Sequence, residues 1–281
     1  MIRLIIFCCL LFYFVDLFAC EIIDDSNKSF VFTKPVQRVI SLAPDITELL
    51  FSAGANKQVV GVMQGSDWPS SVKHIPVVAA FDHIDAEKIL ALHPDLIIAP
   101  MTQSLNRQLE KISLPVFYIH IEKLQDIPIK IRQFGCMLNT KKTAETSARQ
   151  FEHHYDALLH HYKNTKKITV FYEVWSKPLF TVSKNNWIDD VIILCGGQNI
   201  FADIQNDSPE VNIESVITRA PDVIIGAASD PDWQNTWKPW TSIPAVKQHY
   251  LFSINPDEIE RAGPRVLDGA DRVCQWLAEV R

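Results

Sequence analysis

The longest regular pattern of apolar and polar positions lies in residues 139–163. Apolar side chains recur there at every third or fourth position, which places them along one side of an α-helix; they are Ala144, Ala148, Phe151, Tyr155, Leu158 and Tyr162. Neither Gly nor Pro interrupts the segment. Some twenty helical residues span about 30 Å. Because its apolar stripe is narrow, this helix is predicted to lie across two bodies and connect them.

The sequences on the two sides of this helix share one pattern. Residues 46–54 (ITELLFSAG) and 188–196 (IDDVIILCG) both have helical spacing and end at a glycine, the residue that ends many helices in a left-handed conformation. Residues 92–98 and 219–225 both pass through Pro-Asp into three aliphatic residues, a pattern typical of buried strands. Two matches in the same order predict two α/β lobes of related design.

Strand and helix patterns alternate with short connections through both halves, which favours a mostly parallel sheet in each. Expected strands cover residues 38–42, 59–63, 96–99, 115–119, 167–175, 180–182 and 223–226. Expected helices, besides those above, cover residues 85–92, 103–112, 125–138, 214–219 and 264–280. We therefore expect two Rossmann-like α/β lobes, residues 21–138 and 166–281, joined by one long backbone helix within residues 139–165.

Residues 1–20 have the features of a secretory signal. Arg3 precedes an apolar run over residues 4–15, and Ala19 then offers a small residue for cleavage. The run is too short for a stable membrane span. Residues 17–20 (LFAC) also resemble a lipoprotein signal, which would place a lipid on Cys20; simple cleavage near Ala19 is the alternative. Either outcome predicts a mature protein outside the cytosol, in the periplasm.

Charge and cysteine content narrow the possible partners. The formal net charge of −6 argues against nucleic acid as a partner, since binding phosphates requires clustered Lys and Arg.

Outside the cytosol, cysteines can form disulfides. Cys195 and Cys274 both fall in the second lobe, so a bridge between them is plausible, whereas Cys136 is expected to remain a buried free thiol.

Four segments carry a resemblance to a known family. They are residues 38–48 (RVISLAPDITE), 86–95 (AEKILALHPD), 195–201 (CGGQNIF) and 259–265 (IERAGPR). In this order they resemble the vitamin B12-binding members of the helical-backbone class of ABC-transporter substrate-binding proteins. The likeness extends over nearly the whole mature chain. It implies a monomeric binding protein, not an enzyme, that holds a corrinoid between two lobes and delivers it to membrane permease subunits. The corrinoid would be cargo, and no resident cofactor is implied.

The resemblance also implies individual residues. Phe81 and Phe180 match aromatic walls of the family's ligand cleft, which suits a broad corrin ring. The lobe-two loop that contacts the ligand matches Asp257, Glu258, Ile259, Glu260 and Arg261. Two positions depart from the family, because Gly65 replaces a cleft tyrosine and Ser208 replaces a tryptophan. Trp68, Trp175 or Trp187 are candidates to supply those faces, with core packing as the alternative for each.

Two further pairs follow from the same likeness. Glu87 and Glu214 occupy equivalent places in the two lobes, each just before a Pro-Asp strand, and match glutamates that dock onto permease arginines. An exposed glutamate is ordinarily only solvated, but two at equivalent positions favour docking. Cys195 and Cys274 match a bridged pair of the family, which supports a disulfide between them.

Other functions have weaker support. His153, His154, His160 and His161 lack the spacing of three or four with which one helix chelates a metal, so no metal site is expected. No Gly-rich phosphate loop or nucleophile elbow occurs, which leaves a secreted α/β hydrolase without a specific motif. The closest alternative is a ferric siderophore or haem binder of the same class, with His83 as the candidate haem ligand.

Overall fold

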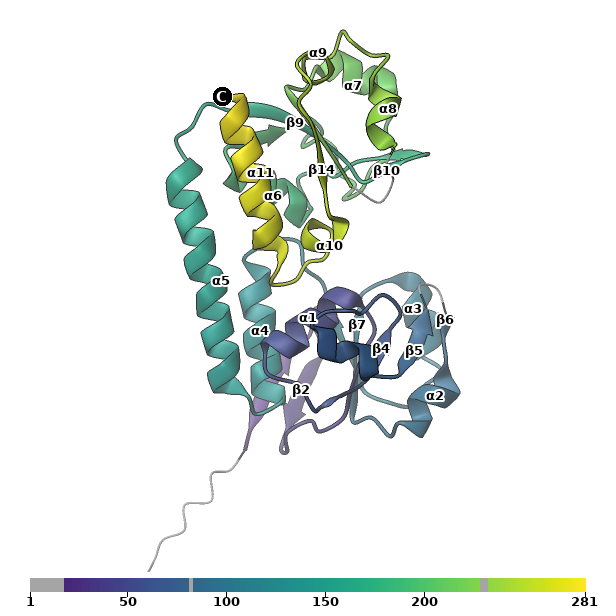
Figure 1. Ribbon diagram of the computed structural model, residues 1–281. Helices are drawn as coiled ribbons and strands as arrows, with labels where there is room; N and C mark the ends of the chain where they lie inside the picture. The colour runs from purple at the N-terminus through teal and green to yellow at the C-terminus, as the bar shows by residue number, and fades with distance from the viewer. Residues whose placement is uncertain (1–17, 81–82, 228–231) are drawn as a thin grey trace, which may run out of the picture.

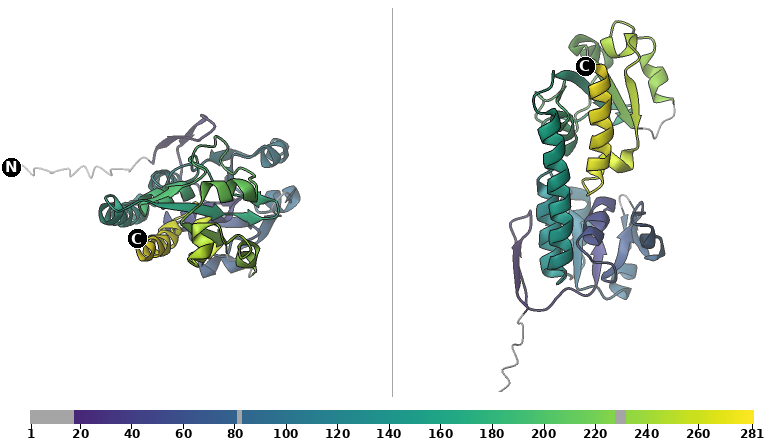
Figure 2. Two further views of the ribbon diagram at one scale, coloured as in Figure 1. Left: turned by 90° about the horizontal axis from the view of Figure 1, so that it is seen from above. Right: turned by 60° about the vertical axis from the view of Figure 1, so that its left-hand side comes forward.

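The computed structural model describes residues 18–80, 83–227 and 232–281. Two α/β lobes are connected by one long helix, α5 (Lys141–Tyr162), which runs along both of them (Figure 1, Figure 2). The apolar residues that predicted this helix are its buried face, with Ala144, Ala148 and Phe151 among the residues of the main core. The predicted fold, two α/β lobes joined by a backbone helix, is therefore confirmed.

Lobe one is built on a six-stranded sheet with the order β6-β5-β4-β3-β7-β8. Its strands are β3 (Val39–Ser41), β4 (Val59–Met63), β5 (Val77–Ala80), β6 (His83–Ile84), β7 (Leu96–Pro100) and β8 (Val116–Ile119). All neighbours are parallel except β5 and β6. Its helices are α1 (Pro44–Ser52), α2 (Ala86–Ala91), α3 (Gln103–Leu109) and α4 (Asp126–Met137), with a 3-10 turn at Ser70–His74. Because the strands from β5 to β8 in this order run parallel, the loops and helices that follow them all begin at the same edge of the sheet.

Lobe two repeats the design with a four-stranded parallel sheet of order β12-β9-β13-β14. Its strands are β9 (Ile168–Glu173), β12 (Gly197–Asn199), β13 (Val223–Ala227) and β14 (Leu251–Ile254), with a hairpin of β10 (Trp175–Ser176) and β11 (Leu179–Phe180). Its helices are α6 (Trp187–Leu194), α7 (Ile213–Arg219), α8 (Trp233–Trp237), α9 (Pro244–Lys247), α10 (Pro256–Ile259) and α11 (Val266–Val280). Gly54 and Gly196, which predicted the ends of α1 and α6, both have positive φ as a left-handed helix end requires.

An N-terminal hairpin, β1 (Cys20–Ile23) and β2 (Ser29–Phe32), was not expected from the sequence. It covers the edge strand β8, whose free backbone groups would otherwise be open to pairing with other chains. Asp24 Oδ2 accepts a hydrogen bond from Tyr118 N at 3.1 Å, and Asp25 Oδ2 accepts one from His120 N at 2.5 Å. Lys130 of α4, which is buried, pairs with Asp25 at 2.6 Å. The hairpin is thus an integral part of lobe one.

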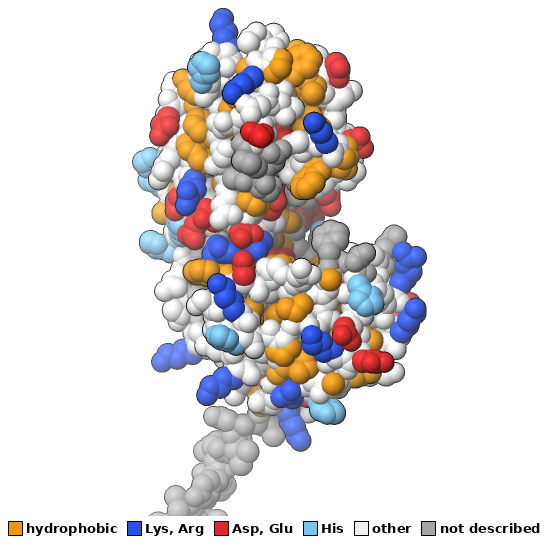
Figure 3. All heavy atoms as spheres, turned by 45° about the vertical axis from the view of Figure 1, so that its right-hand side comes forward, with side chains coloured by type: hydrophobic (Ala, Val, Ile, Leu, Met, Phe, Trp, Pro, Cys, Tyr) orange, Lys and Arg blue, Asp and Glu red, His pale blue; other side chains and the backbone are white. Residues whose placement is uncertain are grey.

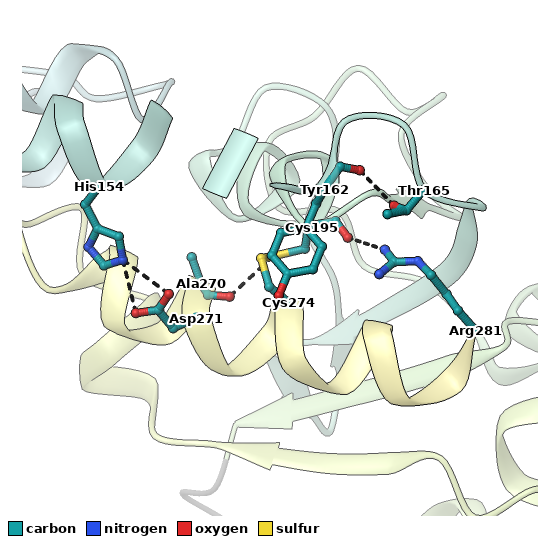
Figure 4. Close-up of a disulfide and its surroundings, with 8 residues drawn as sticks. All are labelled: His154, Tyr162, Thr165, Cys195, Ala270, Asp271, Cys274 and Arg281. Carbon is teal, nitrogen blue, oxygen red and sulfur yellow. Dashed lines mark hydrogen bonds and ion pairs between the residues drawn. A yellow bond between two sulfur atoms is a disulfide. The ribbon is translucent and has the colours of Figure 1, made fainter. Parts of the chain in front are cut away.

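Two disulfides connect elements within the lobes. Cys195 at the end of α6 bonds to Cys274 of α11, as the resemblance implies, and α11 also meets α5 through His154 and Asp271 (Figure 4). The second bond joins Cys20 of β1 to Cys136 of α4. The expectation of a free thiol at Cys136 is therefore wrong. The sequence does not indicate this pairing, because residues 1–20 have the features of a signal segment, whereas Cys20 is the first residue of the folded hairpin.

Helix α5 packs closely on both lobes. A Cβ added at Gly135 of α4 would lie 2.2 Å from Ala144 Cβ, so glycine is what allows α4 and α5 to approach this closely. Arg132 of α4 bridges two carboxylates of α5, Glu145 at 2.7 Å and Glu152 at 2.6 Å. Over the described parts of the chain, every helix is too short or too polar to cross a bilayer. The connection between the lobes is a packed helix and not a flexible linker.

Candidate functional site

The loops that follow strands β3, β4 and β14 bring the two lobes into contact. In parallel α/β sheets, the loops after the strands gather at the carboxyl edge, where such proteins bind ligands. Strand β3 leads into α1 with Glu48, β4 leads to Gly65, and β14 leads through α10 to Arg261. Acidic and basic side chains gather where the two lobes meet (Figure 3). This contact forms the floor of the candidate cleft.

Glu48 of lobe one binds two arginines of lobe two. Its side chain is only 2% exposed, and its Oε1 accepts a hydrogen bond from Arg261 Nη1 at 3.1 Å. Arg265 donates two hydrogen bonds to the same carboxylate, from Nη2 to Oε1 at 2.6 Å and from Nε to Oε2 at 2.9 Å. Hydrogen bonding to Glu48 raises the pKa of Arg265 above its usual value. A buried carboxylate requires such pairing, so Glu48 ties lobe one to lobe two.

Arg261 has further partners on both sides of the cleft. Its guanidinium contacts Asp67 Oδ1 at 2.7 Å and the backbone oxygen of Gly65 at 3.2 Å, both in lobe one. Within lobe two it pairs with Asp257 at 2.6 Å. Burial lowers the pKa of Arg261, but its hydrogen bonds to Asp67 and Glu48 outweigh that effect and raise it. Arg261 is therefore a fixed cation at the centre of the cleft floor.

Gly65, where the resemblance implies a tyrosine, occupies a backbone conformation that favours glycine. Its φ is +87°, a region that residues with a side chain rarely adopt. The space beside it is open, since the nearest atom to an added Cβ is Pro44 Cγ at 3.7 Å. The loop as folded here requires glycine for its conformation, and a tyrosine at this position would strain it.

Trp68 stands three residues further along the same loop and lies at the cleft. It is 49% exposed, and the guanidinium carbon of Arg265 sits 4.8 Å from its ring centroid, in the geometry of a cation–π contact. Trp68 borders a hollow of about 250 Å³ that residues of both lobes line, among them Asp67 and Asp257. The structure thus places this tryptophan, one of the candidates named above, between the lobes.

Lobe two contributes aromatic side chains from the β10–β11 hairpin. Phe180 is half-buried and lies directly across the hairpin from Trp175, which is 58% exposed. Trp175 borders a hollow of about 630 Å³ in lobe two, together with Lys177 and Asn235. Trp187 packs inside lobe two instead, with Nε1 donating to the Ile259 oxygen at 2.9 Å. Phe81 lies outside the described residues.

The predicted ligand loop after β14 has mixed surroundings. Ile259 is fully buried, so its side chain belongs to the core. Glu260 Oε1 accepts a hydrogen bond from the Tyr172 hydroxyl at 3.1 Å, and burial raises the pKa of Glu260. Glu258 pairs with Arg272 at 3.0 Å. Of the five predicted residues, Asp257 and Arg261 are the two that the structure brings into the inter-lobe cluster.

Several residues of the site were not singled out from the sequence. Glu48, Asp67 and Arg265 complete the charged cluster between the lobes. Asp45 lies in the first turn of α1, close to Glu48. Burial raises the pKa of Asp45 from 3.8 to about 6, and the nearby Glu48 charge adds to the increase. Glu48 and Arg265 lie within the motif segments at residues 38–48 and 259–265, so the motifs held the signal. The contact between Glu48 and Arg265 joins residues that are 217 positions apart, so no local sequence pattern could predict it.

The predicted docking residues lie away from this cluster. Glu87 is exposed in the first turn of α2, and Glu214 is exposed in the first turn of α7. In Figure 1, α2 lies at the lower right of lobe one and α7 at the top of lobe two. Among the described residues, no group of three or more His, Cys, Asp or Glu side chains is arranged to hold a metal ion.

Comparisons with known proteins agree with this architecture. A vitamin B12-binding protein of Vibrio parahaemolyticus is 34% identical over 252 residues, which span 88% of this chain and 92% of that protein. Another, of Pectobacterium atrosepticum, is 36% identical over 87% of this chain and 90% of its own length. The crystal structure of the periplasmic vitamin B12-binding protein of Vibrio cholerae superposes with a TM-score of 0.80 at 31% identity, covering 88% of this chain and 98% of that one. The family model described as periplasmic binding protein matches residues 39–258. The chain therefore belongs to the periplasmic binding protein family, and within it resembles vitamin B12-binding proteins.

Proposed function

We propose that this chain binds cobalamin in the cleft between its lobes and delivers it to the permease of an ABC importer. One observation carries the proposal: a vitamin B12-binding protein at 34% identity aligns with 88% of the chain, so both lobes and the connecting helix are matched together. The function needs no catalytic group. It requires a cleft that both lobes line, and the Glu48–Arg261 contact places residues of both lobes at one floor.

The chemistry of the cleft suits a corrin. This ring is broad and largely apolar on its faces, with amides around its rim, so it needs flat walls and hydrogen-bond partners. We propose that Trp68 supplies a wall from lobe one and Phe180 a wall from lobe two, with Phe81 as a further wall. Asp257 and Arg261 offer an acceptor and a donor at the rim. Ile259 would act by anchoring this loop in the core rather than by touching the ligand.

Two family aromatics are missing, at Gly65 and Ser208, and this bears on affinity. The exposed ring of Trp175 lies on the hairpin that carries Phe180 and is available on the lobe-two side. We propose that Trp68 and Trp175 together replace part of the lost aromatic surface. Burying a large apolar side chain contributes about 1.5–3 kcal/mol, so incomplete replacement would weaken cobalamin binding relative to proteins that keep both aromatics.

Delivery requires a docking surface outside the cleft. We propose that Glu87 and Glu214 bind basic residues of the permease, one lobe to each subunit. Both are exposed at the start of short helices, at equivalent places in the two lobes. Their negative charge would be complementary to arginine side chains. The protein would act as a monomer, because the permease would then meet one lobe with each half.

Location follows from the N-terminal segment. We propose that the signal ends at Ala19, one residue earlier than expected, and that the mature protein diffuses freely in the periplasm. A sulfur that is bonded to Cys136 cannot also form the thioether of a lipoprotein, so the Cys20–Cys136 bond supports release over lipid anchoring. We further propose lobe boundaries at residues 20–138 and 166–281, with residues 139–165 as the connecting segment.

A ligand panel tests the proposed function. Purified protein would be titrated separately with cobalamin, haemin and a ferric hydroxamate siderophore, with heat and absorbance recorded for each. We expect one-to-one binding of cobalamin and no comparable response to the other two. Tight haemin binding without cobalamin binding would instead support the haem alternative, with His83 as the first residue to replace.

A further inference from the structure

We propose that Glu48 is a positioning residue for the ligand cleft: through Arg265 it fixes the ring of Trp68, so that a lobe-two cation holds a lobe-one aromatic wall in place. The inference rests on the proposed function, because it assigns Trp68 a role in cobalamin binding. It concerns three residues from two lobes that form a continuous chain of contacts. Glu48 itself would not touch the ligand, since its side chain is 2% exposed and lies beneath the arginines.

The first contact in this chain has little freedom. Two of the Arg265 nitrogens reach the two oxygens of Glu48, at 2.6 and 2.9 Å, so the plane of the guanidinium is set by the plane of the carboxylate. The loop is also held close, because a Cβ added at Gly263 would lie 3.2 Å from Glu48 Oε2. The position of Arg265 is therefore determined by lobe one, although the residue belongs to lobe two.

The second contact connects Arg265 to the candidate wall. Its guanidinium carbon lies 4.8 Å from the centroid of the Trp68 ring. Trp68 is half exposed, and an exposed side chain that must be ordered on binding costs affinity. A guanidinium placed against the ring before the ligand arrives removes part of that cost. The contact thus pre-organises Trp68.

The charges around the chain of contacts explain why Glu48 is needed. Arg261 and Arg265 are two cations that share this one buried carboxylate. Arg261 has other anionic partners in Asp67 and Asp257, whereas the ion pair found for Arg265 is with Glu48. Without Glu48, the two cations would repel each other and Arg265 would lose the groups that orient it. Loss of Glu48 is therefore expected to displace Arg265 more than Arg261.

The test uses variants that separate positioning from folding. Arg265→Lys keeps the positive charge but loses the planar guanidinium, and with it the two parallel hydrogen bonds to Glu48 and the stacking on the Trp68 ring. Glu48→Gln keeps the shape of the side chain but loses its charge. Arg219→Lys is a matched control, because Arg219 also joins a carboxylate, Asp203 at 2.8 Å, to an aromatic ring, Phe201 at 4.6 Å, but within lobe two alone. Proteins labelled with 5-fluorotryptophan would report Trp68 by fluorine NMR, with Trp68→Phe identifying its signal.

We expect Arg265→Lys to move and broaden the Trp68 signal without ligand and to weaken cobalamin binding about tenfold, equivalent to about 1.4 kcal/mol. Glu48→Gln should do the same, and the double variant should be little worse than either single one, because both act on one chain of contacts. Arg219→Lys should change neither readout. An unchanged Trp68 signal or unchanged affinity in Arg265→Lys would overturn the inference, even if Glu48→Gln fails to fold. If the unaltered protein does not bind cobalamin, the proposed function fails, while the ligand-free Trp68 signal still decides whether Arg265 fixes the ring.

Discussion

The two disulfides make a quantitative prediction, because each closes a separate loop in a different lobe. Cys20 and Cys136 are 116 residues apart, and Cys195 and Cys274 are 79 apart. In the chain-entropy model, loops of these sizes stabilise the fold by about 4.9 and about 4.5 kcal/mol. Because the loops do not overlap in sequence and lie in different lobes, the two contributions should be nearly additive.

The perturbation is the removal of each pair by Cys→Ala substitution. Variants lacking Cys20 and Cys136, lacking Cys195 and Cys274, or lacking all four would be unfolded in urea beside the parent protein. We expect each pair to cost several kcal/mol and the quadruple variant to cost about the sum. Loss of the first pair should destabilise lobe one in particular, which hydrogen exchange resolved by segment can establish, since α4 and the hairpin belong to that lobe.

Thiol counting supplies the refuting result. Protein exported to the periplasm and denatured without reductant should show no reactive thiols, since Cys8 and Cys9 leave with the signal. Two free thiols would contradict the Cys20–Cys136 bond, and one free thiol together with a lipid mass on the N-terminal residue would restore lipid anchoring through Cys20. A variant without Cys20 and Cys136 that is as stable as the parent would refute the energetic reasoning.

Three further predictions concern binding, transport and pH. Phe180→Ala should weaken cobalamin binding by about 1.5–3 kcal/mol if the ring is buried on the ligand; calorimetry decides, and unchanged affinity removes Phe180 from the site. Replacing Glu87 and Glu214 by Arg should abolish cobalamin uptake by cells while the purified protein still binds; a loss of affinity that matches the loss of uptake would place them in the cleft instead. Burial raises the pKa of Asp45 to about 6 from 3.8, so the ionised carboxylate costs stability above pH 6, and the cost disappears as the pH falls from 6 towards 4. Asp45→Asn should therefore stabilise the protein at pH 8 and have little effect at pH 4; urea unfolding at both values measures this, and an equal effect at both would show that the charge is not the cause.

Local patterns in the sequence predicted the framework of the fold. The apolar stripe of α5 and the positive-φ glycines at residues 54 and 196 depend on neighbours within one or two turns. The expected strand at residues 167–175 was too long, because β9 ends at Glu173, a buried side chain whose Oε1 accepts a hydrogen bond from Ser176 at 2.6 Å. Trp175 then begins the short hairpin strand β10. Such a turn depends on a buried polar group that no periodicity reveals.

Contacts between distant residues account for what the sequence left open. The N-terminal hairpin has strands of only four residues each, and its role appears only when β8 provides an edge to cover and Cys136 provides a partner. The Glu48–Arg265 pair joins residues from different lobes, so its existence depends on how α5 places them. The sequence shows a glycine at residue 65, but the φ of +87° that favours glycine there is a property of the folded loop.

The central claim is that cobalamin binds between the lobes. Hydrogen–deuterium exchange of the purified protein, measured with and without saturating cobalamin, tests binding and location together. We expect cobalamin to slow exchange in the cleft loops of both lobes, around residues 65–68 in lobe one and residues 257–261 in lobe two, and to leave exchange in α2 and α7 unchanged. No change in exchange anywhere, or slowing confined to one lobe away from these loops, would contradict it.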